Sequence, residues 1–239
     1  MEFVCLAAGR GTRMGRLGVY LQKCMYPVGL RPFLELSLLE VAAAGAGRVH
    51  IVVGHLGGQI EEYFGREYGG MDLVYVHQEE PRGTGHALAL VAPHLPPGAG
   101  SVLVWQADVH LPRELVGALE RHLGPNVVTL VEEPGAPAEV MVTAECGRVT
   151  RAWQGAGPYS DAGVWRLEPR LLPELGRHAA PGGEYRALPN LQALIEAGRA
   201  AVGFVTVARR LHIGGTAPTP EANVADVVAR LLAREADGR

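Results

Sequence analysis

The sequence has little of what marks several common classes of protein. No apolar run approaches the roughly 18 residues that a membrane-spanning helix needs. The net charge of −3 gives no basic field that would attract a nucleic acid polymer. Three scattered cysteines, Cys5, Cys24 and Cys146, lack the spacing of a metal site and suit a reducing compartment. The first apolar strand begins at residue 2, so we expect no signal peptide and a cytoplasmic protein.

Lysine is nearly absent, which makes the one lysine that is present informative about function. Of the 22 basic residues, 21 are arginine, and Lys23 is the only lysine. An ammonium is a compact charge on a flexible stem, whereas a guanidinium is a planar fork that does not replace it at a crowded phosphate. The retained lysine therefore indicates a chemical requirement at position 23. The alternative is a solvated surface lysine left there by chance.

Two familiar phosphate-binding motifs are also missing. A dinucleotide fingerprint would need a third glycine where Met14 stands, and the Gly-Lys-Ser/Thr of an ATP-binding loop occurs nowhere. What is present is an apolar strand over residues 2–7, followed by Gly9, Gly11 and two arginines. The glycines allow a sharp turn that presents backbone N–H groups to a ligand. Bare amides and guanidinium groups at the carboxyl end of a strand predict a polyphosphate site.

The stretch Leu6 to Met14, Leu-Ala-Ala-Gly-Arg-Gly-Thr-Arg-Met, resembles the signature of the sugar-1-phosphate nucleotidyltransferase family. That signature continues with a lysine, a Pro-Val pair and a Pro-x-Leu-Glu helix start, which here are Lys23, Pro27-Val28 and Pro32 to Glu35. The resemblance implies an α/β fold: a Rossmann-like, doubly wound, mostly parallel sheet of GT-A-like type with a small β-rich sugar-binding insertion. It implies one domain over 1–239, with a nucleotide-binding half (1–132) and an acceptor-binding half with a C-terminal helix (133–239).

The hydrophobic pattern supports alternating strands and helices, which favour right-handed parallel crossovers in the first half. We expect helices from Pro32 to Gly45, near Ile60 to Tyr68, after Gly83, from Pro112, from Ala187 to Ala197 and from Pro218 to Leu232. We expect strands at Val49–Val53, Leu73–Val76, Ser101–Trp105, Val127–Val131, Ala162–Leu167 and Val202–Val207, with a hairpin formed by Glu139–Ala144 and Arg148–Trp153.

The resemblance assigns the nucleotide to the two polar loops of the first half. Gln78 and the run from Gly83 to Ala87 look most like the uridylyl members that use N-acetylglucosamine 1-phosphate, and a Gln amide can pair with both a donor and an acceptor of uracil. The three small residues at the start of this helix are also a place where a ligand could approach the backbone. A glycine-rich helix start without a ligand is the alternative. By resemblance, the catalytic residues are Arg13 and Lys23, and the nucleotide-binding residues are Leu6, Ala7, Ala8, Gly9, Gly11, Thr12, Gln78, Gly83 and Thr84.

Asp108 follows the expected strand Ser101–Trp105, and a lone acid at the tip of a buried strand is where α/β sheets place chemistry. The family carries a metal-binding Asp there, and a carboxylate can hold Mg²⁺ while phosphate oxygens complete the octahedron. We therefore expect Mg²⁺ as cofactor. His212 stands where many members have a second metal-binding Asp, although Mg²⁺ prefers oxygen ligands. The alternative for Asp108 is an N-cap before the helix that opens at Pro112.

The resemblance is weaker on the acceptor side. Gln154 stands where the family usually has an acid, and Asp161 stands where it has the Asn of an Asn-x-Gly segment that here ends in Gly163. By resemblance, these three residues would contact the sugar phosphate. Their departures from the family pattern leave the identity of the sugar open.

The resemblance implies an enzyme, a nucleotidyltransferase that joins a nucleoside triphosphate, with UTP favoured, to a sugar 1-phosphate and releases pyrophosphate. Three alternatives stay open: a cytidylyltransferase for an alcohol phosphate, a GT-A glycosyltransferase and a non-catalytic nucleotide-binding relative. Arg13 and Lys23 argue against the glycosyltransferase, because that enzyme needs no triphosphate site. The expected partners are the two small substrates, with no nucleic acid and no membrane, and a homo-oligomer stays open.

Overall fold

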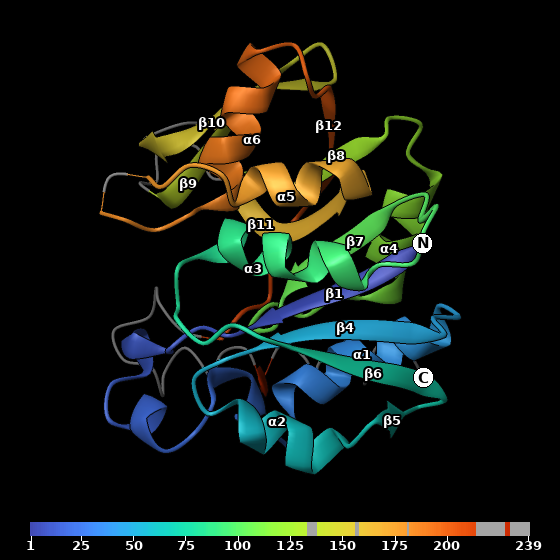
Figure 1. Ribbon diagram of the computed structural model, residues 1–239, viewed down its shortest axis with the longest axis vertical. Coiled ribbons are helices and arrows are strands. Elements are labelled where there is room, and N and C mark those ends of the chain that lie inside the picture. Colours follow the sequence, from blue (N-terminus) through green and yellow to red (C-terminus); the bar gives the residue numbers. More distant parts are fainter. Residues whose placement is uncertain (133–137, 156–157, 181, 214–227, 230–239) are drawn as a thin grey trace.

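The computed structural model describes residues 1–132, 138–155, 158–180, 182–213 and 228–229, without the side chains of 138–141 and 152–155. In this part of the chain, a single large sheet is covered by helices on both faces (Figure 1). The helix expected over Pro218 to Leu232 lies outside the described residues, apart from Val228 and Ala229, which are helical. Among the described helices, none is both long enough and apolar enough to cross a membrane.

The first half of the sheet is parallel and is built around β1 (Glu2–Ala7). This strand lies between β4 (Arg48–Val53) and β7 (Val102–Gln106), and β4 pairs in turn with β6 (Met71–His77). β1, β4 and β7 are buried almost throughout, and such strands carry near-continuous apolar runs, which is why they could be located from the sequence. A short antiparallel strand, β5 (Glu67–Tyr68), closes this edge of the sheet.

The second half of the sheet is mixed. β11 (Tyr159–Leu167) runs antiparallel between β7 and β8 (Asn126–Glu132), and β12 (Val202–Val207) pairs in parallel with β8. The expected hairpin is present as β9 (Ala138–Glu145) and β10 (Arg148–Gly155), which complete the order β5-β6-β4-β1-β7-β11-β8-β12-β10-β9. The fold is therefore a mixed α/β sheet, parallel around β1 and largely antiparallel beyond β7.

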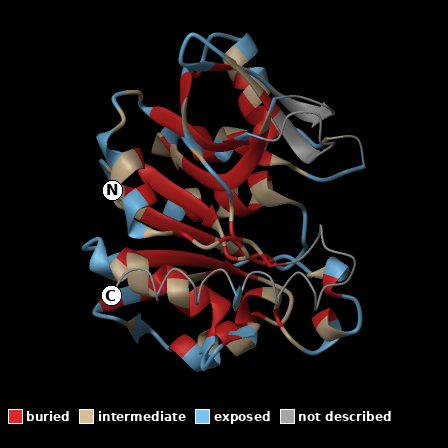
Figure 2. Cartoon of the chain, turned by 180° about the vertical axis from the view of Figure 1, so that it is seen from behind, coloured by how far each residue is buried: buried red, intermediate tan, exposed pale blue. Residues whose placement is uncertain are grey.

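The helices divide between the two faces of the sheet. α1 (Phe33–Ala43), α2 (Gly57–Phe64) and α4 (Arg113–Arg121) pack on one face, and α3 (Thr84–Val91), α5 (Leu172–Leu175) and α6 (Ala187–Glu196) pack on the other. The side chains of β1 alternate accordingly, because successive residues of a strand point to opposite faces. Figure 2 shows the buried strands enclosed between helices whose outer sides are exposed.

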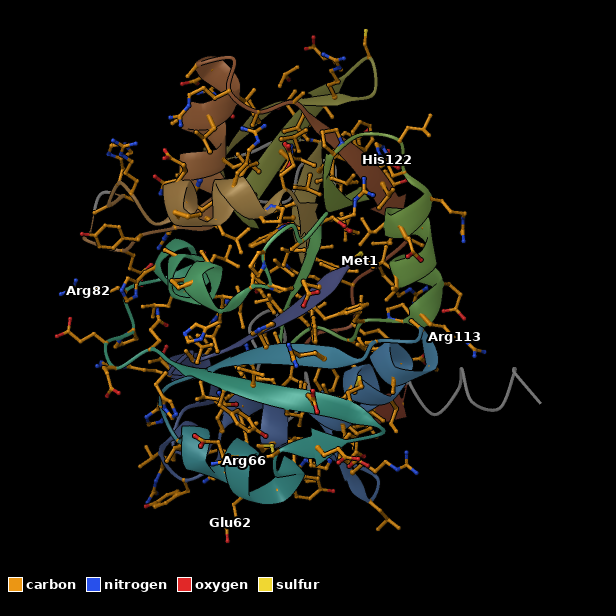
Figure 3. The ribbon with its side chains drawn as sticks, turned by 45° about the vertical axis from the view of Figure 1, so that its right-hand side comes forward. Met1, Glu62, Arg66, Arg82, Arg113 and His122 are labelled. Atoms are coloured by element: carbon orange, nitrogen blue, oxygen red, sulfur yellow. The ribbon has the colours of Figure 1, made fainter. Side chains whose placement is uncertain are left out.

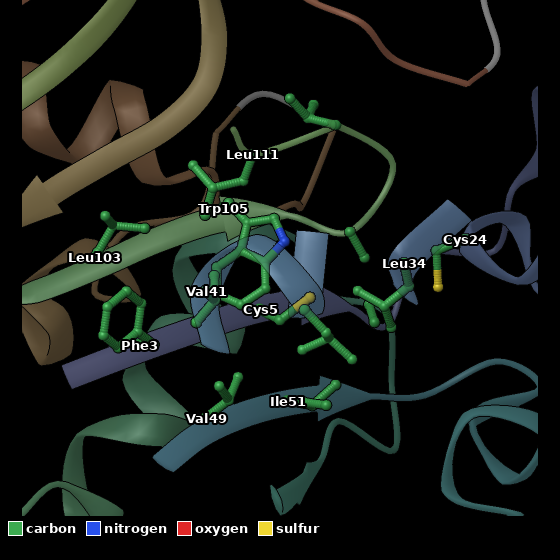
Figure 4. Packing of buried hydrophobic residues seen from close by; sticks show 14 of the residues in the cluster. Phe3, Cys5, Cys24, Leu34, Val41, Val49, Ile51, Leu103, Trp105 and Leu111 are labelled. Atoms are coloured by element: carbon green, nitrogen blue, oxygen red, sulfur yellow. The ribbon is translucent and has the colours of Figure 1, made fainter. Parts of the chain in front are cut away.

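The core on the α1 face is centred on Trp105, which is fully buried at the end of β7. Its indole packs among Phe3 and Cys5 of β1 and Val41 of α1 (Figure 4). At the far end of α4, His122 lies beside β12 (Figure 3), where a Cβ on Gly203 would come within 2.5 Å of His122 Cε1. Glycine at 203 thus allows α4 to end against the sheet.

The helix expected to run from Ile60 to Tyr68 was predicted too long. It ends at Phe64, because Gly65 adopts a φ of 64° and stops the helical path. The chain then forms β5, which turns back onto β6 through two glycines that also have positive φ angles, Gly69 and Gly70.

Candidate active-site cleft

A cleft of about 490 Å³ opens at the carboxyl ends of β1, β6 and β7. In α/β sheets this edge is where ligands bind. Three loops that are far apart in the sequence meet there, namely those that follow each of the three strands. The cleft is lined by every residue that was predicted to be catalytic or to bind nucleotide, and by Asp108: Leu6, Ala7, Ala8, Gly9, Gly11, Thr12, Arg13, Lys23, Gln78, Gly83, Thr84 and Asp108.

The loop after β1 turns sharply. Gly11 adopts a left-handed φ of 62° and accepts a hydrogen bond from Met14 N at 2.8 Å, which opens a short 3₁₀ turn over Thr12–Met14. Met14 is buried against Phe33 and Ile213, which explains why a side chain and not a third glycine occupies this position. A Cβ on Gly18 would lie 2.7 Å from Gly11 O, so the loop also folds closely onto itself.

Lys23 and Asp108 are in direct contact across the cleft. The Lys23 ammonium donates to the Asp108 carboxylate, and the two side chains are 10% and 21% exposed. Burial opposes ionisation of the Asp108 carboxyl, but the Lys23 ammonium outweighs it, so the net effect is a lowered pKa for Asp108. Asp108 is therefore a carboxylate at neutral pH, in contact with the Lys23 side chain.

Gln22 holds Lys23 in place, a role that was not predicted from the sequence. Its buried side chain donates from Nε2 to Ala7 O at 2.7 Å and accepts from Cys24 N at 2.7 Å. Its backbone N–H donates to Gln59 Oε1 of α2 at 2.8 Å. The short turn that carries Lys23 is thus fixed both to the end of β1 and to α2. The sequence shows only that an amide residue precedes the only lysine. It does not show that Gln22 bonds to Ala7 and Gln59, which are distant in the chain.

Gln78 is buried, and its amide nitrogen is engaged within the protein. Nε2 donates to Gly83 O at 3.1 Å and lies 2.9 Å from His86 Nδ1. Burial lowers the pKa of His86, which favours the neutral ring that can accept this bond. With both amide hydrogens directed at the protein, the Gln78 group suited to a ligand is its carbonyl oxygen, an acceptor. The expected donor-and-acceptor pairing with uracil is therefore reduced to the acceptor alone.

The small residues at the start of α3 face protein as well as the cleft. A Cβ on Gly85 would lie 2.0 Å from Leu175 O, and Gly85 N donates to Tyr185 O at 2.7 Å. Gly85 thus serves close packing, and it is not among the residues that line the cleft. Glu184, which precedes Tyr185 in the chain, also lines the cleft. This contribution was not predicted from the sequence.

The loop before α3 is joined to this segment by its backbone. Tyr185 N donates to Arg82 O at 2.6 Å, while the Arg82 side chain points away from the protein (Figure 3) and pairs with Glu80 at 2.8 Å. Thr84 Oγ1 accepts from Ala187 N at 3.0 Å, at the first residue of α6. The cleft wall from the first half is therefore braced by the second half.

Two of the residues predicted for the sugar phosphate, Asp161 and Gly163, are not among the described residues that line the cleft. Asp161 is buried in β11 and accepts from Trp165 Nε1 at 2.7 Å, and its burial raises the pKa of the carboxyl. Gly163 has a φ of 78°, and a Cβ there would come within 3.1 Å of Gln106, a residue of the cleft lining. Gln154 lies in β10, and its side chain is outside the described residues. The roles of these three residues stay predictions.

His212 lies against the turn that carries Asp108. It forms an antiparallel bridge with Val109, and Ile213 N donates to Asp108 O at 2.9 Å. Burial, reinforced by the nearby Arg210 charge, lowers the pKa of His212 to about 4, so the imidazole is neutral at neutral pH and could act as a metal ligand.

The donor set fits one substrate-bridged Mg²⁺ better than a protein-enclosed metal. Within the described ranges no group of three or more His, Cys, Asp or Glu side chains could hold a metal ion. Mg²⁺ is commonly bound by one or two carboxylates, with waters and substrate phosphates as the other ligands. Asp108, which faces the cleft and keeps 21% of its side chain exposed, suits that arrangement.

Comparison with known proteins gives a consistent result. The model of the MobA-like NTP transferase domain matches residues 3–173. A bifunctional protein GlmU from Chromohalobacter salexigens is 38% identical over 157 residues, which cover 63% of this chain and 32% of the relative. GlmU from Geobacter sulfurreducens is 35% identical over 158 residues, 64% of this chain and 30% of the relative. The matched region thus spans about a third of the length of these relatives.

A solved structure shows the same fold. A Bacillus anthracis protein named as a glucose-1-phosphate thymidylyltransferase, crystallised with a sucrose, superposes with a TM-score of 0.79 over 96% of this chain and 94% of that one. The two sequences are 15% identical, so the likeness concerns the fold alone. It confirms the nucleotide-diphospho-sugar transferase architecture that the sequence predicted.

Proposed function

Because the chain belongs to the family of MobA-like NTP transferase domains, we propose that it transfers a nucleotidyl group from a nucleoside triphosphate to a sugar 1-phosphate and releases pyrophosphate. One observation carries the proposal: the loop after β1, the only lysine and Asp108 come together in a single cleft at the carboxyl edge of the sheet. The nucleotide half is then 1–132, and 133–239 supplies the acceptor side.

In this reaction an oxygen of the acceptor phosphate attacks the α-phosphorus of the triphosphate. The new P–O bond forms as the bond from the α-phosphorus to the bridging oxygen breaks, and pyrophosphate leaves with that electron pair. A phosphate monoester is already a nucleophile at neutral pH, so the mechanism needs no general base. The protein has to position two anions and to neutralise their charge.

The loop residues Gly9, Gly11 and Thr12 would cradle the triphosphate, and Arg13 would bind the departing pyrophosphate. Lys23, fixed by Gln22, would neutralise charge near the α-phosphate in the transition state. Mg²⁺ held by Asp108, with His212 as a candidate further ligand, would supply charge neutralisation on the phosphate oxygens. Until the phosphates arrive, the contact between Lys23 and Asp108 compensates both charges within the cleft.

We favour UTP and N-acetylglucosamine 1-phosphate as the substrate pair. The motif at Gln78 and Gly83-Thr84 looks most like that of the uridylyl members, and relatives named GlmU are 35–38% identical over 63–64% of this chain. The Gln78 carbonyl oxygen can accept the N3–H of uracil. Thymine carries the same N3–H donor, so the choice between UTP and dTTP has to be made by experiment.

The test is release of pyrophosphate in the presence of Mg²⁺, measured for UTP, dTTP, CTP, ATP and GTP against N-acetylglucosamine 1-phosphate, glucose 1-phosphate and phosphocholine. Turnover with a sugar 1-phosphate supports the proposal, and turnover confined to phosphocholine and CTP would favour the cytidylyltransferase for an alcohol phosphate. A Lys23→Met protein serves as the matched inactive control. Tight triphosphate binding with no turnover on any pair would indicate a non-catalytic relative and would contradict the proposal.

A further inference from the structure

The segment after β12 lies directly beside the turn that carries Asp108, although about a hundred residues separate the two in the sequence. His110 N donates to Leu211 O at 2.8 Å, and Ile213 N donates to Asp108 O at 2.9 Å. The cleft lining includes Asp108 but no residue of 207–213. This segment therefore flanks Asp108 from beyond the cleft that the proposed function assigns to the triphosphate.

Arg210 is the cation of this segment that is held by a hydrogen bond to β11. Its Nη1 donates to Asp161 O at 2.8 Å, and the residue is half-buried. Its charge acts on both Asp108 and His212, lowering the pKa of each. A guanidinium has five N–H donors in a planar fork, so one can hold Asp161 O while a pair is presented to a phosphate.

The proposed reaction brings a second anion to this place. In an in-line displacement, the attacking and leaving oxygens stand on opposite sides of the phosphorus. With the triphosphate in the cleft, the acceptor phosphate enters at the Asp108 end, where it would bring between one and two negative charges at neutral pH. Lys23 already faces Asp108, so a cation from the second half of the chain would offset this added charge.

We propose that Arg210 binds the phosphate of the acceptor, as the counterpart of Arg13 and Lys23 on the triphosphate. The inference rests on the proposed function and deepens it, because it names the group that recognises the acceptor anion. It also reassigns Asp161: the carboxylate is bonded to Trp165, and the carbonyl oxygen of the residue anchors Arg210.

The first test is steady-state kinetics of Arg210→Gln with the substrate pair found for the wild type. A charged hydrogen-bonded contact is worth about 10–100-fold in affinity, so the KM for the acceptor should rise by that factor while the KM for the triphosphate stays within about twofold. Arg210→Lys should recover part of the loss, since it keeps the charge. The neighbouring Arg209→Gln is the matched control, because Arg209 is exposed and carries the same charge. An unchanged acceptor KM in Arg210→Gln would overturn the inference and would leave the proposed function standing.

A second test does not depend on turnover. Inorganic phosphate, the anion common to all such acceptors, is titrated into wild-type protein, Arg210→Gln and Arg209→Gln in the presence of Mg²⁺ and a non-hydrolysable UTP analogue, with binding followed by calorimetry. Phosphate binding that weakens about tenfold or more in Arg210→Gln alone supports the inference. Equal affinity in all three proteins overturns it. Thermal unfolding midpoints that agree among the three exclude a merely structural effect.

Discussion

Replacing Lys23 by methionine should destabilise the protein as well as inactivate it. The substitution keeps an apolar chain of similar length but leaves the Asp108 carboxylate buried without its ammonium partner. Breaking a buried ion pair costs about 3–5 kcal/mol. Because 21% of the Asp108 side chain stays accessible to water, we expect a cost below that range, about 2–3 kcal/mol. For a chain of this size this corresponds to a fall of about 4–12 °C in the unfolding midpoint.

The loss should depend on pH, with a sign that follows from the pKa of Asp108. In the wild type this pKa is lowered, so the ion pair contributes stability above the unfolded-state value of about 3.9, and the contribution fades as pH falls through the folded-state value. In Lys23→Met the uncompensated burial raises the folded-state pKa. The carboxyl then takes up a proton as pH falls, and the difference between variant and wild type should shrink from pH 7 toward pH 5.

The assay is thermal unfolding at pH 7 and pH 5, followed by circular dichroism or calorimetry. The double variant Lys23→Met/Asp108→Asn removes the buried charge and should regain at least half of the lost stability at pH 7. Its turnover should remain about 10²–10³-fold below wild type or lower, because the transition-state charge is still missing. Arg48→Met is the control: its pair with Asp72 at 3.1 Å is exposed, so the loss should stay below about 1 kcal/mol. A single variant that unfolds within one degree of wild type at pH 7, or a double variant no more stable than the single, would refute the reasoning.

Three further predictions follow from other contacts in the structure. Gln22→Met removes both side-chain hydrogen bonds that fix the turn carrying Lys23. In steady-state kinetics turnover should therefore fall about tenfold or more, with little change in the KM for the triphosphate. Turnover equal to that of the wild type would argue against a positioning role. Gly85→Ala places a Cβ 2.0 Å from Leu175 O and should lower stability by at least about 1–3 kcal/mol in denaturant unfolding, whereas Gly58→Ala, with nothing within 4 Å, should be neutral or stabilising. The Arg166 guanidinium of β11 donates to Glu120 O at 3.3 Å and to His122 O at 2.9 Å, at the end of α4. Arg166→Met removes these donors and should cost about 1–3 kcal/mol in the same assay; an unchanged midpoint would mean that water replaces the guanidinium.

The parts of the fold that the sequence predicted well depend on local patterns. The strands Glu2–Ala7 and Val202–Val207 were located by apolar runs between turn residues, and the structure confirms both. The hairpin was located by alternation on either side of Cys146 and Gly147, whose positive φ angles of 49° and 76° form its turn. The family signature marked the residues that line the cleft, because a motif of this length specifies a loop shape.

What the sequence did not yield depends on contacts between distant segments. The α2 helix was extended through Gly65 because its apolar pattern continues past the residue that stops it. Gly85 looked like a place for a ligand, since nothing local shows that Leu175 O fills the space where a Cβ would stand. Gln22 and Arg210 are each held by a hydrogen bond to a distant residue, Gln59 and Asp161 respectively. Such pairings become visible only when the chain is folded.

The central claim is that the bond between the α-phosphorus and the bridging oxygen breaks and that the acceptor phosphate is joined to the α-phosphorus. The most direct test is to incubate the protein with Mg²⁺, N-acetylglucosamine 1-phosphate and UTP labelled with ³²P at either the α or the γ position, and to separate the products. Transfer predicts that the α label appears in a nucleotide sugar and the γ label in pyrophosphate, with neither product formed by Lys23→Met. Label from the γ position in inorganic phosphate, with no α label in a nucleotide sugar, would identify triphosphate hydrolysis and would contradict the account.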